Sequence, residues 1–234
     1  NTQAAAAHTT EATSPANAST PSVTQTSAST NKPSGKIAGV TQKRYYLLGN
    51  PNDPYYASSW YLPAVNAPTA WGITTGSNTV VVADIDTGFA LSHEDLSAHW
   101  HYNPGESGGG KETNGIDDDG NGYVDDYRGW DFVDSDNSPQ AGTTNPTGDG
   151  TTHGSETAGL IGAVGNNNVG TTAIAQNVSI MPLQVIDDNG SGYSDDVASA
   201  ISYAVDNGAD VINMSLGTSG NDPIVQAAVD DAAA

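Results

Sequence analysis

The sequence contains no cysteine among its 234 residues. A disulfide framework, thiol catalysis and thiolate zinc sites are therefore excluded for this chain. Long hydrophobic runs are also missing, since no apolar stretch approaches the roughly 20 residues that a membrane-spanning helix needs. We therefore expect no membrane insertion.

Positive charge is scarce. Six Lys and Arg residues stand against 27 Asp and Glu, the formal net charge is −21, and no Lys or Arg follows Arg128. Such a surface repels phosphate backbones and anionic lipids, so we expect no nucleic-acid partner. The same charge favours the binding of cations.

Large apolar side chains are rare at the start of the chain, where Ala, Thr, Ser, Pro and Asn dominate. A segment of this composition cannot bury enough surface to offset the entropy of ordering. We predict a disordered linker over residues 1–48 and a folded domain over residues 49–234. The mucin-like Ser/Thr/Pro composition favours a secreted or cell-surface extracellular protein.

Apolar, β-branched runs alternate with helical patterns in the folded part. The patterns predict strands over residues 79–86, 178–187 and 210–217, and helices over residues 153–164, 193–208 and 222–234. The alternation predicts an α/β fold with a doubly wound, mostly parallel sheet and helices on both faces. In the helix over residues 193–208 we expect Val197, Ile201, Tyr203 and Val205 to be apolar positions. Pro182 is an irregularity in its strand, because proline cannot donate to the ladder.

Two residues in this pattern are candidates for catalysis. Asp86 ends a predicted strand, and catalytic groups gather at the carboxyl ends of parallel strands. His153 stands at the mouth of a predicted helix in TTHGSETAGL, residues 151–160. In a Ser-His-Asp relay the carboxylate orients the imidazole, which takes the proton of the nucleophile. Taken alone, each residue also has a structural interpretation, Asp86 as a turn former and His153 as a packing residue.

Several segments in order resemble the subtilisin-like serine peptidases: VVADIDTGFALSHEDL, HGSETAGLIGAVGNNNVG and the run from VSIMPLQVID to NMSLG. The resemblance covers about Asn52 to the end of the chain. It implies a serine endopeptidase in which His153 is the general base and Asp86 its orienting acid. It also implies that an extended polypeptide substrate, or the enzyme's own propeptide, binds as an added strand. The substrate-binding residues it implies are Gly190, Ser191, Gly192, Ser215, Leu216 and Gly217.

The resemblance is incomplete at three positions. The family commonly has His and Val where this sequence has Glu156 and Thr157, and an aliphatic residue where it has Asp84. Asp84 and Asp86 are two residues apart and share one face of their strand. A buried second carboxylate there would raise the pKa of one of the pair.

The family's oxyanion Asn and its nucleophile motif, Gly-Thr-Ser-x-Ala, do not occur before Ala234. Ser219 lies in GTSG without the following Ala, so we interpret it as a loop residue, and the family's hydroxyl at the position of Ser155 is structural. We therefore expect a sheet that is incomplete at the C-terminus and a fragment that is inactive as a protease. The alternative is a non-catalytic, calcium-binding extracellular module derived from such an enzyme.

A second chemical feature lies in the segment NGIDDDGNGYVDDYR, residues 114–128. Its pattern D-x-D-x-N-G-x-x-D matches the first nine positions of an EF-hand loop, whose oxygen ligands surround one Ca²⁺. Arg128 occupies the twelfth position in place of the bidentate Glu, which favours a loop closed by another ligand or by water. A solvated turn is the structural alternative. Similar insertions occur in bacterial members of the family, and the expected ligands are Asp117, Asp119, Asn121, Asp125 and the carbonyl of Tyr123.

A further calcium site is implied by GNNNVG, residues 165–170. The family often binds a stabilising Ca²⁺ in this loop through an Asn side chain and backbone carbonyls, which nominates Asn166 or Asn167. One residue is inserted relative to the usual pattern, so both remain candidates. We expect Ca²⁺ to be the cofactor and to stabilise a fold that has no disulfides.

Overall fold

The computed structural model describes residues 50–142 and 150–234, all of which belong to one compact unit, Tyr45–Ala234. The linker that we predict over residues 1–48 lies outside the described residues. Among the helices within the described ranges, none is both long and apolar enough to cross a membrane.

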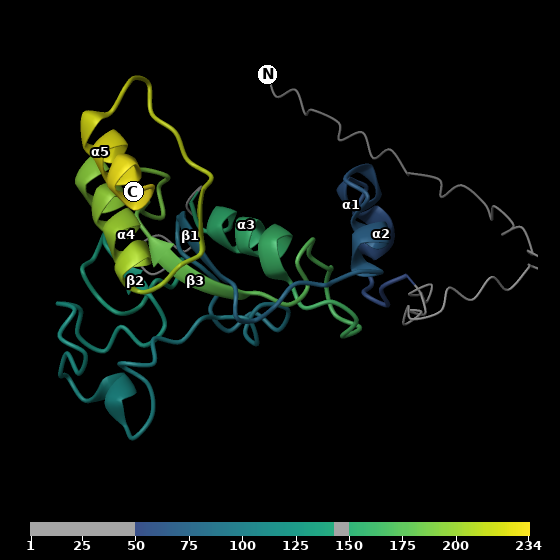
Figure 1. Cartoon of the computed structure of the whole chain (residues 1–234), viewed down its shortest axis with the longest axis horizontal. Coiled ribbons are helices and arrows are strands. Elements are labelled where there is room, and N and C mark those ends of the chain that lie inside the picture. The colour runs from purple at the N-terminus through teal and green to yellow at the C-terminus, as the bar shows by residue number, and fades with distance from the viewer. Residues whose placement is uncertain (1–49, 143–149) are drawn as a thin grey trace, which may run out of the picture. The chain divides into compact units, whose positions relative to one another are not determined.

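A four-stranded parallel sheet lies at the centre of this unit (Figure 1). Its strands are β1 (Val81–Asp86), β2 (Trp130–Asp131), β3 (Ser179–Gln184) and β4 (Val211–Met214), in the spatial order β2-β3-β1-β4. In the register, Ile85 lies opposite Leu183 of β3 and Met214 of β4. Every residue of β1 is buried, because β1 is a central strand whose two faces are both covered.

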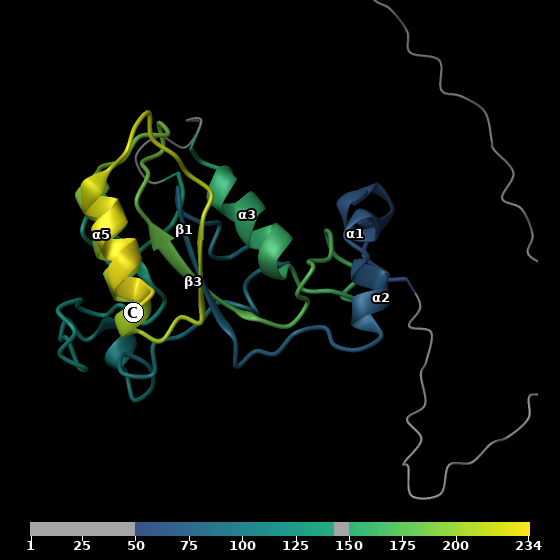
Figure 2. The same cartoon turned by 45° about the horizontal axis from the view of Figure 1, so that its top comes forward.

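Helices cover both faces of the sheet, as the two views in Figures 1 and 2 show. Helix α3 (His153–Gly162) packs on one face, where Ala158 joins Phe89 and Ile180 in a buried cluster. Helix α4 (Ser194–Asp206) packs on the other face against Ala83 and Ile85, and α5 (Pro223–Ala232) packs against α4. The predicted α/β fold with a parallel sheet is confirmed.

Helix α4 differs from its prediction at one position. Val197, Ala200, Ile201 and Ala204 are buried at the spacing i, i+3, i+4, i+7, and Tyr203 is buried with them. Val205, which we gave as one of the apolar positions of this helix, is 44% exposed. Val205 therefore lies at the margin of the buried stripe of α4.

The end of α4 is set by Gly208, which has a φ of +78°. The amide of Gly208 donates to the carbonyl of Val205 at 3.1 Å and that of Ala209 donates to Ala204 at 2.9 Å. This pair of bonds is a Schellman motif, in which glycine avoids the steric cost of the left-handed conformation. The predicted closure of the helix at Gly208 therefore has a local cause.

Pro182 is accommodated inside β3 by the strand's neighbours. The backbone of Ile180, two residues before Pro182, points away from β1 and bonds to the backbone of His99 and His101. The carbonyl of Gln184, two residues after Pro182, points to the same side and accepts the amide of Phe132. By alternation, the missing N–H of Pro182 belongs to this same side, where β2 pairs only with Leu183 and Gln184. The proline therefore interrupts no bond between β3 and β1.

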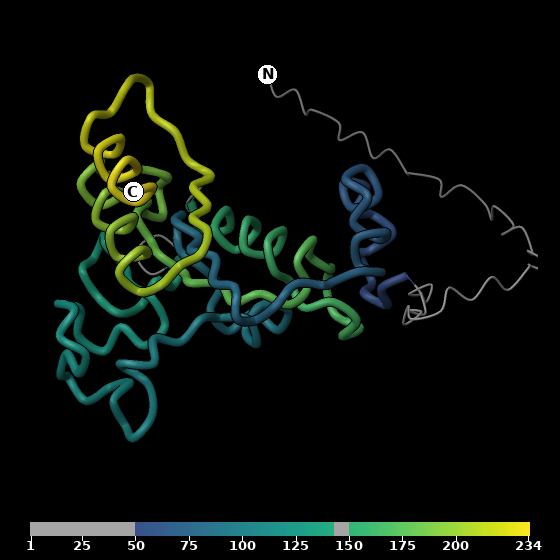
Figure 3. The backbone as a smooth tube through the Cα atoms, in the orientation of Figure 1, coloured from purple at the N-terminus to yellow at the C-terminus, as the bar shows by residue number. Residues whose placement is uncertain are grey.

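Short elements outside the sheet were not predicted: η1 (Tyr56–Ser58), α1 (Tyr61–Ala64), α2 (Ala67–Trp71) and η2 (Lys111–Thr113). Trp71 anchors α2 by donating its indole N–H to the carbonyl of Ile174 at 2.9 Å. A long excursion separates β1 from β2 and is coloured teal in Figure 3. It contains η2 and the predicted calcium loop.

Candidate active site

Asp86 and His153 come together because the first turn of α3 lies against the end of β1. The amide of Gly154 donates to the hydroxyl of Thr87 at 3.0 Å. A Cβ at Gly154 would lie only 2.3 Å from the carbonyl oxygen of Gly88, so only glycine allows this approach. The neighbouring His153 is thereby held beside Asp86.

The pair is joined by a hydrogen bond of 2.7 Å between His153 Nδ1 and Asp86 Oδ1. The amide of Thr87 also donates to Asp86 Oδ1 at 2.7 Å. The side chain of Asp86 is 1% exposed, whereas that of His153 is 48% exposed. The hydrogen bond to Asp86 raises the pKa of His153, and burial opposes this shift. With a proton held on Nδ1, the exposed Nε2 of a neutral imidazole is free to accept a proton.

Asp84 is fully buried on the same face of β1. Its Oδ1 accepts a hydrogen bond of 2.8 Å from Asn213 Nδ2, and its Oδ2 accepts one of 3.0 Å from the hydroxyl of Thr157. Burial raises the pKa of Asp84 to about 7; the bond from Asn213 opposes this rise and the charge of Asp86 adds to it. Asp84 therefore keeps its proton to a higher pH than an ordinary aspartate does.

The two predicted substrate-binding segments line shared cavities beside this pair. A hollow of about 280 Å³ is bordered by Asp86, His153, Gly190 and residues 215–217. A second cavity, of about 510 Å³, is bordered by residues 190–194 on one side and by Leu216 and Gly217 on the other. The two cavities share Gly190, Leu216 and Gly217, so the structure brings together all the residues predicted for this region.

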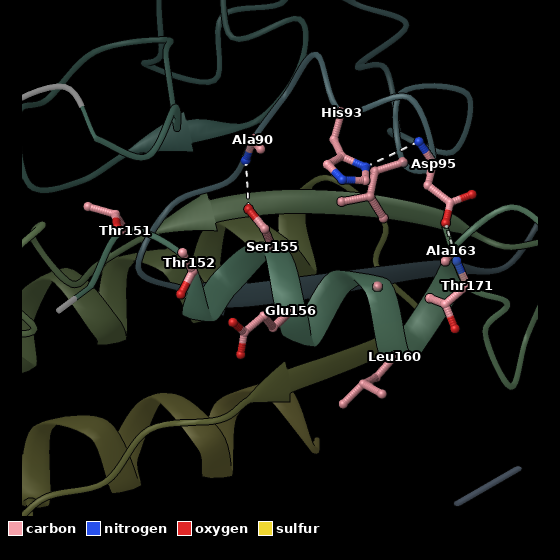
Figure 4. A pocket seen from close by; sticks show the side chains of 12 residues that line it. Ala90, His93, Asp95, Thr151, Thr152, Ser155, Glu156, Leu160, Ala163 and Thr171 are labelled. Carbon is pink, nitrogen blue, oxygen red and sulfur yellow. Dashed lines mark hydrogen bonds between the residues drawn. The ribbon is translucent and has the colours of Figure 1, made fainter. Parts of the chain in front are cut away.

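The serines of this region are engaged elsewhere or exposed. Ser155 Oγ accepts the amide of Ala90 at 2.8 Å, and Figure 4 shows it pointing toward Ala90 while Glu156 points away. Ser155 and Glu156 border a separate cavity of about 620 Å³, which neither Asp86 nor His153 lines. Ser219 is exposed in the loop after β4. Within the described ranges, no hydrogen bond reaches Nε2 of His153.

In the loop over residues 114–128 the carboxylates of Asp117 and Asp119 lie together, since both accept the backbone amide of Asn121, at 3.2 and 3.0 Å. The carboxylate of Asp117 accepts backbone N–H groups from residues 120–122, and that of Asp125 accepts the amide of Gly115. The ring of Tyr123 packs between Trp130 and Tyr203 at centroid distances of 5.0 and 4.9 Å. One oxygen of Asp119 also lies in a cluster with one oxygen each of Glu106 and Asp126, all within 4.8 Å of one another.

Asn121 lies beside this cluster and donates to Asp126 Oδ2 at 2.9 Å. Glu106 and Asp126 are buried and were missed by sequence reasoning. Glu106 lies outside the EF-hand pattern, and Asp126 occupies its tenth position, which carries no ligand in that pattern. No local spacing could have identified either residue.

Asn167 of the second predicted calcium site lies next to two buried carboxylates. Its Nδ2 donates to Asp95 Oδ1 at 2.7 Å. The backbone amides of Asn166 and Asn167 donate to the carboxylate of Asp53 at 2.9 and 3.1 Å. Asp53 and Asp95 were missed because they lie far from this loop in the sequence. Together with the side chain of Asn167, they supply oxygen donors of the type that calcium prefers.

Comparisons with known proteins show the family of the chain. A model of the Subtilase family matches residues 77–234. The chain is 38% identical over 179 residues to thermitase of Thermoactinomyces vulgaris, a match that covers 76% of this chain and 52% of thermitase. It is 34% identical over 173 residues to a halolysin-like extracellular serine protease of Natrialba magadii, covering 74% of this chain and 27% of that protein.

A solved structure gives the same result. The fold is similar to that of a protease from Pseudoalteromonas arctica PAMC 21717, with a TM-score of 0.59 and 30% identity, covering 79% of this chain and 56% of the other. The chain thus spans about half the length, or less, of these relatives. The matched segment includes Asp86, His153 and the walls of the cavities beside them, and the chain belongs to the Subtilase family.

Proposed function

We propose that this chain is the amino-terminal part of the catalytic domain of a secreted serine endopeptidase. The hydrogen bond of 2.7 Å between His153 Nδ1 and the buried Asp86 carries this proposal. His153 Nε2 takes the proton of a serine hydroxyl as the serine oxygen attacks the peptide carbonyl, and then gives that proton to the leaving amine. Asp86 holds the tautomer and stabilises the imidazolium without taking the proton itself.

The substrate is an extended polypeptide, or the enzyme's own propeptide, bound between residues 190–192 and 215–217. The cavities of about 280 and 510 Å³ that these segments line support this assignment. Within the described ranges, no backbone hydrogen bond involves residues 215–217, which leaves that segment available for an added strand, whereas the amide and the carbonyl of Ser191 bind Asp187. The acidic surface disfavours nucleic acid as a partner.

The nucleophile belongs to sequence beyond Ala234, so the chain of 234 residues is inactive by itself. This part is tested by translating the coding DNA past the codon for Ala234 and treating both proteins with a fluorophosphonate probe. We expect labelling of the longer protein only, and its loss in His153→Ala. Labelling of the shorter chain would place the nucleophile within it, and an unlabelled longer protein would contradict the peptidase.

Calcium is the proposed cofactor, bound in the acidic excursion over residues 101–129 and in the loop at Asn167. Buried carboxylates in both regions lack a Lys or Arg ion-pair partner among the described residues, which supports this assignment. A non-catalytic, calcium-binding module is the second candidate function, favoured by the absence of a described serine bonded to His153. Calcium binding without probe labelling of the longer protein would favour that candidate.

A further inference from the structure

Asp84 is a fully buried carboxyl beside the catalytic pair, and the proposed mechanism assigns it no role. Its two oxygens face different neighbours. Oδ1 accepts the side-chain amide of Asn213 at 2.8 Å, and Oδ2 lies 3.0 Å from the hydroxyl oxygen of Thr157. The nitrogen of Asn213 can only donate, whereas a hydroxyl can also accept. A proton on Asp84 therefore resides on Oδ2, the oxygen that faces Thr157.

The hydroxyl of Thr157 has one hydrogen and three acceptors within reach. They are the carbonyl of Gly154 at 2.9 Å, Asp84 Oδ2 at 3.0 Å and Asp86 Oδ2 at 3.4 Å. The carbonyl of Gly154 belongs to the backbone ladder of α3, and an ionised carboxylate is a stronger acceptor than a carbonyl. The hydrogen of Thr157 is therefore shared between the two carboxyl groups according to which of them is ionised.

The second oxygen of Asp86 depends on this hydrogen. Oδ1 of Asp86 accepts both His153 Nδ1–H and the amide of Thr87, each at 2.7 Å. Within the described ranges, the hydroxyl of Thr157 is the only donor within hydrogen-bond distance of Oδ2. The side chain of Asp86 is 1% exposed, so water has little access to that oxygen. A buried carboxylate oxygen without a donor costs free energy.

The groups around Asp84 let it keep a proton. Burial raises the pKa of Asp84 to about 7. The charged groups that act on Asp84 are Asp86 of its own strand, which raises its pKa, and His153 of α3, which lowers it. From the other neighbouring elements, β4 presents the neutral Asn213, and β3 pairs through Pro182. No Lys or Arg forms an ion pair with Asp84 in the part of the chain that the structure describes.

We propose that Asp84 is a positioning residue that acts on Asp86 through Thr157. While Asp84 is protonated, its Oδ2 donates to Thr157 Oγ1, and Thr157 donates its own hydrogen to Asp86 Oδ2. Once Asp84 has released its proton to solvent, the hydrogen of Thr157 turns to Asp84, and Asp86 Oδ2 loses its donor. No proton passes from one carboxyl group to the other, since only the directions of the two hydrogen bonds change.

The consequence for the reaction is that both oxygens of Asp86 are held while Asp84 keeps its proton. A carboxylate fixed at both oxygens holds the imidazole of His153 in one orientation. The family commonly has an aliphatic residue and Val at the positions of Asp84 and Thr157, and such a pair cannot form these bonds. This inference rests on the proposed peptidase function and adds two residues to its site.

The first test is an NMR titration of the His153 imidazole in the 234-residue chain, which requires no nucleophile. Every variant carries Asp84→Asn, whose amide donates to Thr157 as the protonated acid does and does not titrate. Adding Thr157→Val removes the hydroxyl at nearly the same shape, whereas Thr157→Ser keeps it. Asp86 without its donor attracts the imidazolium more strongly. We therefore expect a higher His153 pKa with valine than with threonine, and serine should match threonine.

The second test is the rate of fluorophosphonate labelling in the longer protein that extends past Ala234. At pH 9 the wild type has lost the chain of bonds through Thr157, whereas Asp84→Asn keeps it. The ratio of the rate of Asp84→Asn to that of the wild type should therefore rise about tenfold from pH 6 to pH 9, the effect of one hydrogen bond to a charged group. A residue that serves only the stability of the fold would give the same ratio at both pH values.

Two results would overturn the inference. One is an equal His153 pKa with valine and with serine at position 157 in the Asp84→Asn chain, and the other is a labelling ratio that does not change between pH 6 and pH 9. If Thr157→Val fails to fold with Asp84→Asn, the double variant Asp84→Val/Thr157→Val replaces it, with the same expected rise in the pKa of His153. A longer protein that is not labelled at all would reject the peptidase, whereas the titration judges the link between Asp84 and Asp86 by itself.

Discussion

The hydroxyl of Thr157 in α3 donates a hydrogen bond of 3.0 Å to Oδ2 of Asp84 in β1. These are two of the three positions at which the sequence departs from the subtilase pattern, and they contact each other. Asn213 of β4 binds the other oxygen of Asp84. The carboxyl therefore links α3, β1 and β4 at the strand that carries Asp86.

Asp84 should make the stability of the protein fall with rising pH. The folded protein holds the proton of Asp84 up to about pH 7, whereas the unfolded chain releases it near the ordinary value of 3.8. The stabilisation is complete below pH 3.8 and is lost as the pH rises through about 7. The difference in unfolding free energy between Asp84→Asn and the wild type should therefore shift in favour of the variant by up to about 3 kcal/mol from pH 5 to pH 8.

Urea denaturation at the two pH values measures this gain. Asp131 also has a pKa raised to about 7 by burial, but it is present in both proteins and cancels in the difference. If the difference in unfolding free energy between the two proteins is the same at pH 5 and pH 8, Asp84 does not titrate in this range.

Asp86→Asn should lower the pKa of His153. The hydrogen bond to Asp86 is the main cause of the raised pKa, and burial alone would lower it. NMR titration of the imidazole nitrogens in the 234-residue chain measures this directly and requires no nucleophile. We expect a pKa above 6.5 in the wild type and a lower pKa in the variant. Glu156→Gln is the control, because Glu156 acts only as a lesser charge, and an equal effect there would contradict the assignment.

Gly154→Ala and Gly159→Ala should have opposite effects although both lie in α3. The new methyl at position 154 would meet the carbonyl of Gly88 at 2.3 Å, whereas the one at position 159 would meet nothing within 4 Å. Gly154→Ala should destabilise the protein and separate His153 from Asp86. Gly159→Ala should stabilise it by about 0.5–1 kcal/mol through helix propensity. Thermal unfolding and the His153 titration measure both effects, and a destabilised Gly159→Ala would contradict the packing of α3.

Removal of calcium should lower the melting temperature. A single site held at 100 times its dissociation constant stabilises the fold by about 2.7 kcal/mol. For a domain of this size, each kcal/mol corresponds to roughly 2–4 °C. Calorimetric scans with calcium and with a chelator measure the difference, and magnesium serves as the control ion. An unchanged melting temperature would contradict a stabilising role for calcium.

Local patterns were sufficient for the main strands and helices. Val81–Asp86 is β-branched and apolar, and Pro223 and Gly208 mark helix ends through their own backbone preferences. The short helices α1 and α2 and the two-residue strand β2 have no such pattern. They depend on contacts with distant segments, such as that of Trp71 with Ile174.

The sequence by itself determined the fold class, the family resemblance, the acidic charge and the nomination of Asp86 and His153, because these follow from composition, periodicity and short motifs. Only the tertiary structure decided which carboxylates lie together. It placed Asp84 against Thr157 and Asn213, and Glu106 against Asp119 and Asp126. Thr157 and Asn213 lie 73 and 129 residues from Asp84 in the chain, and Glu106 lies outside any local motif shared with Asp119 and Asp126, so only the packing of the folded chain brings these side chains within a few ångströms.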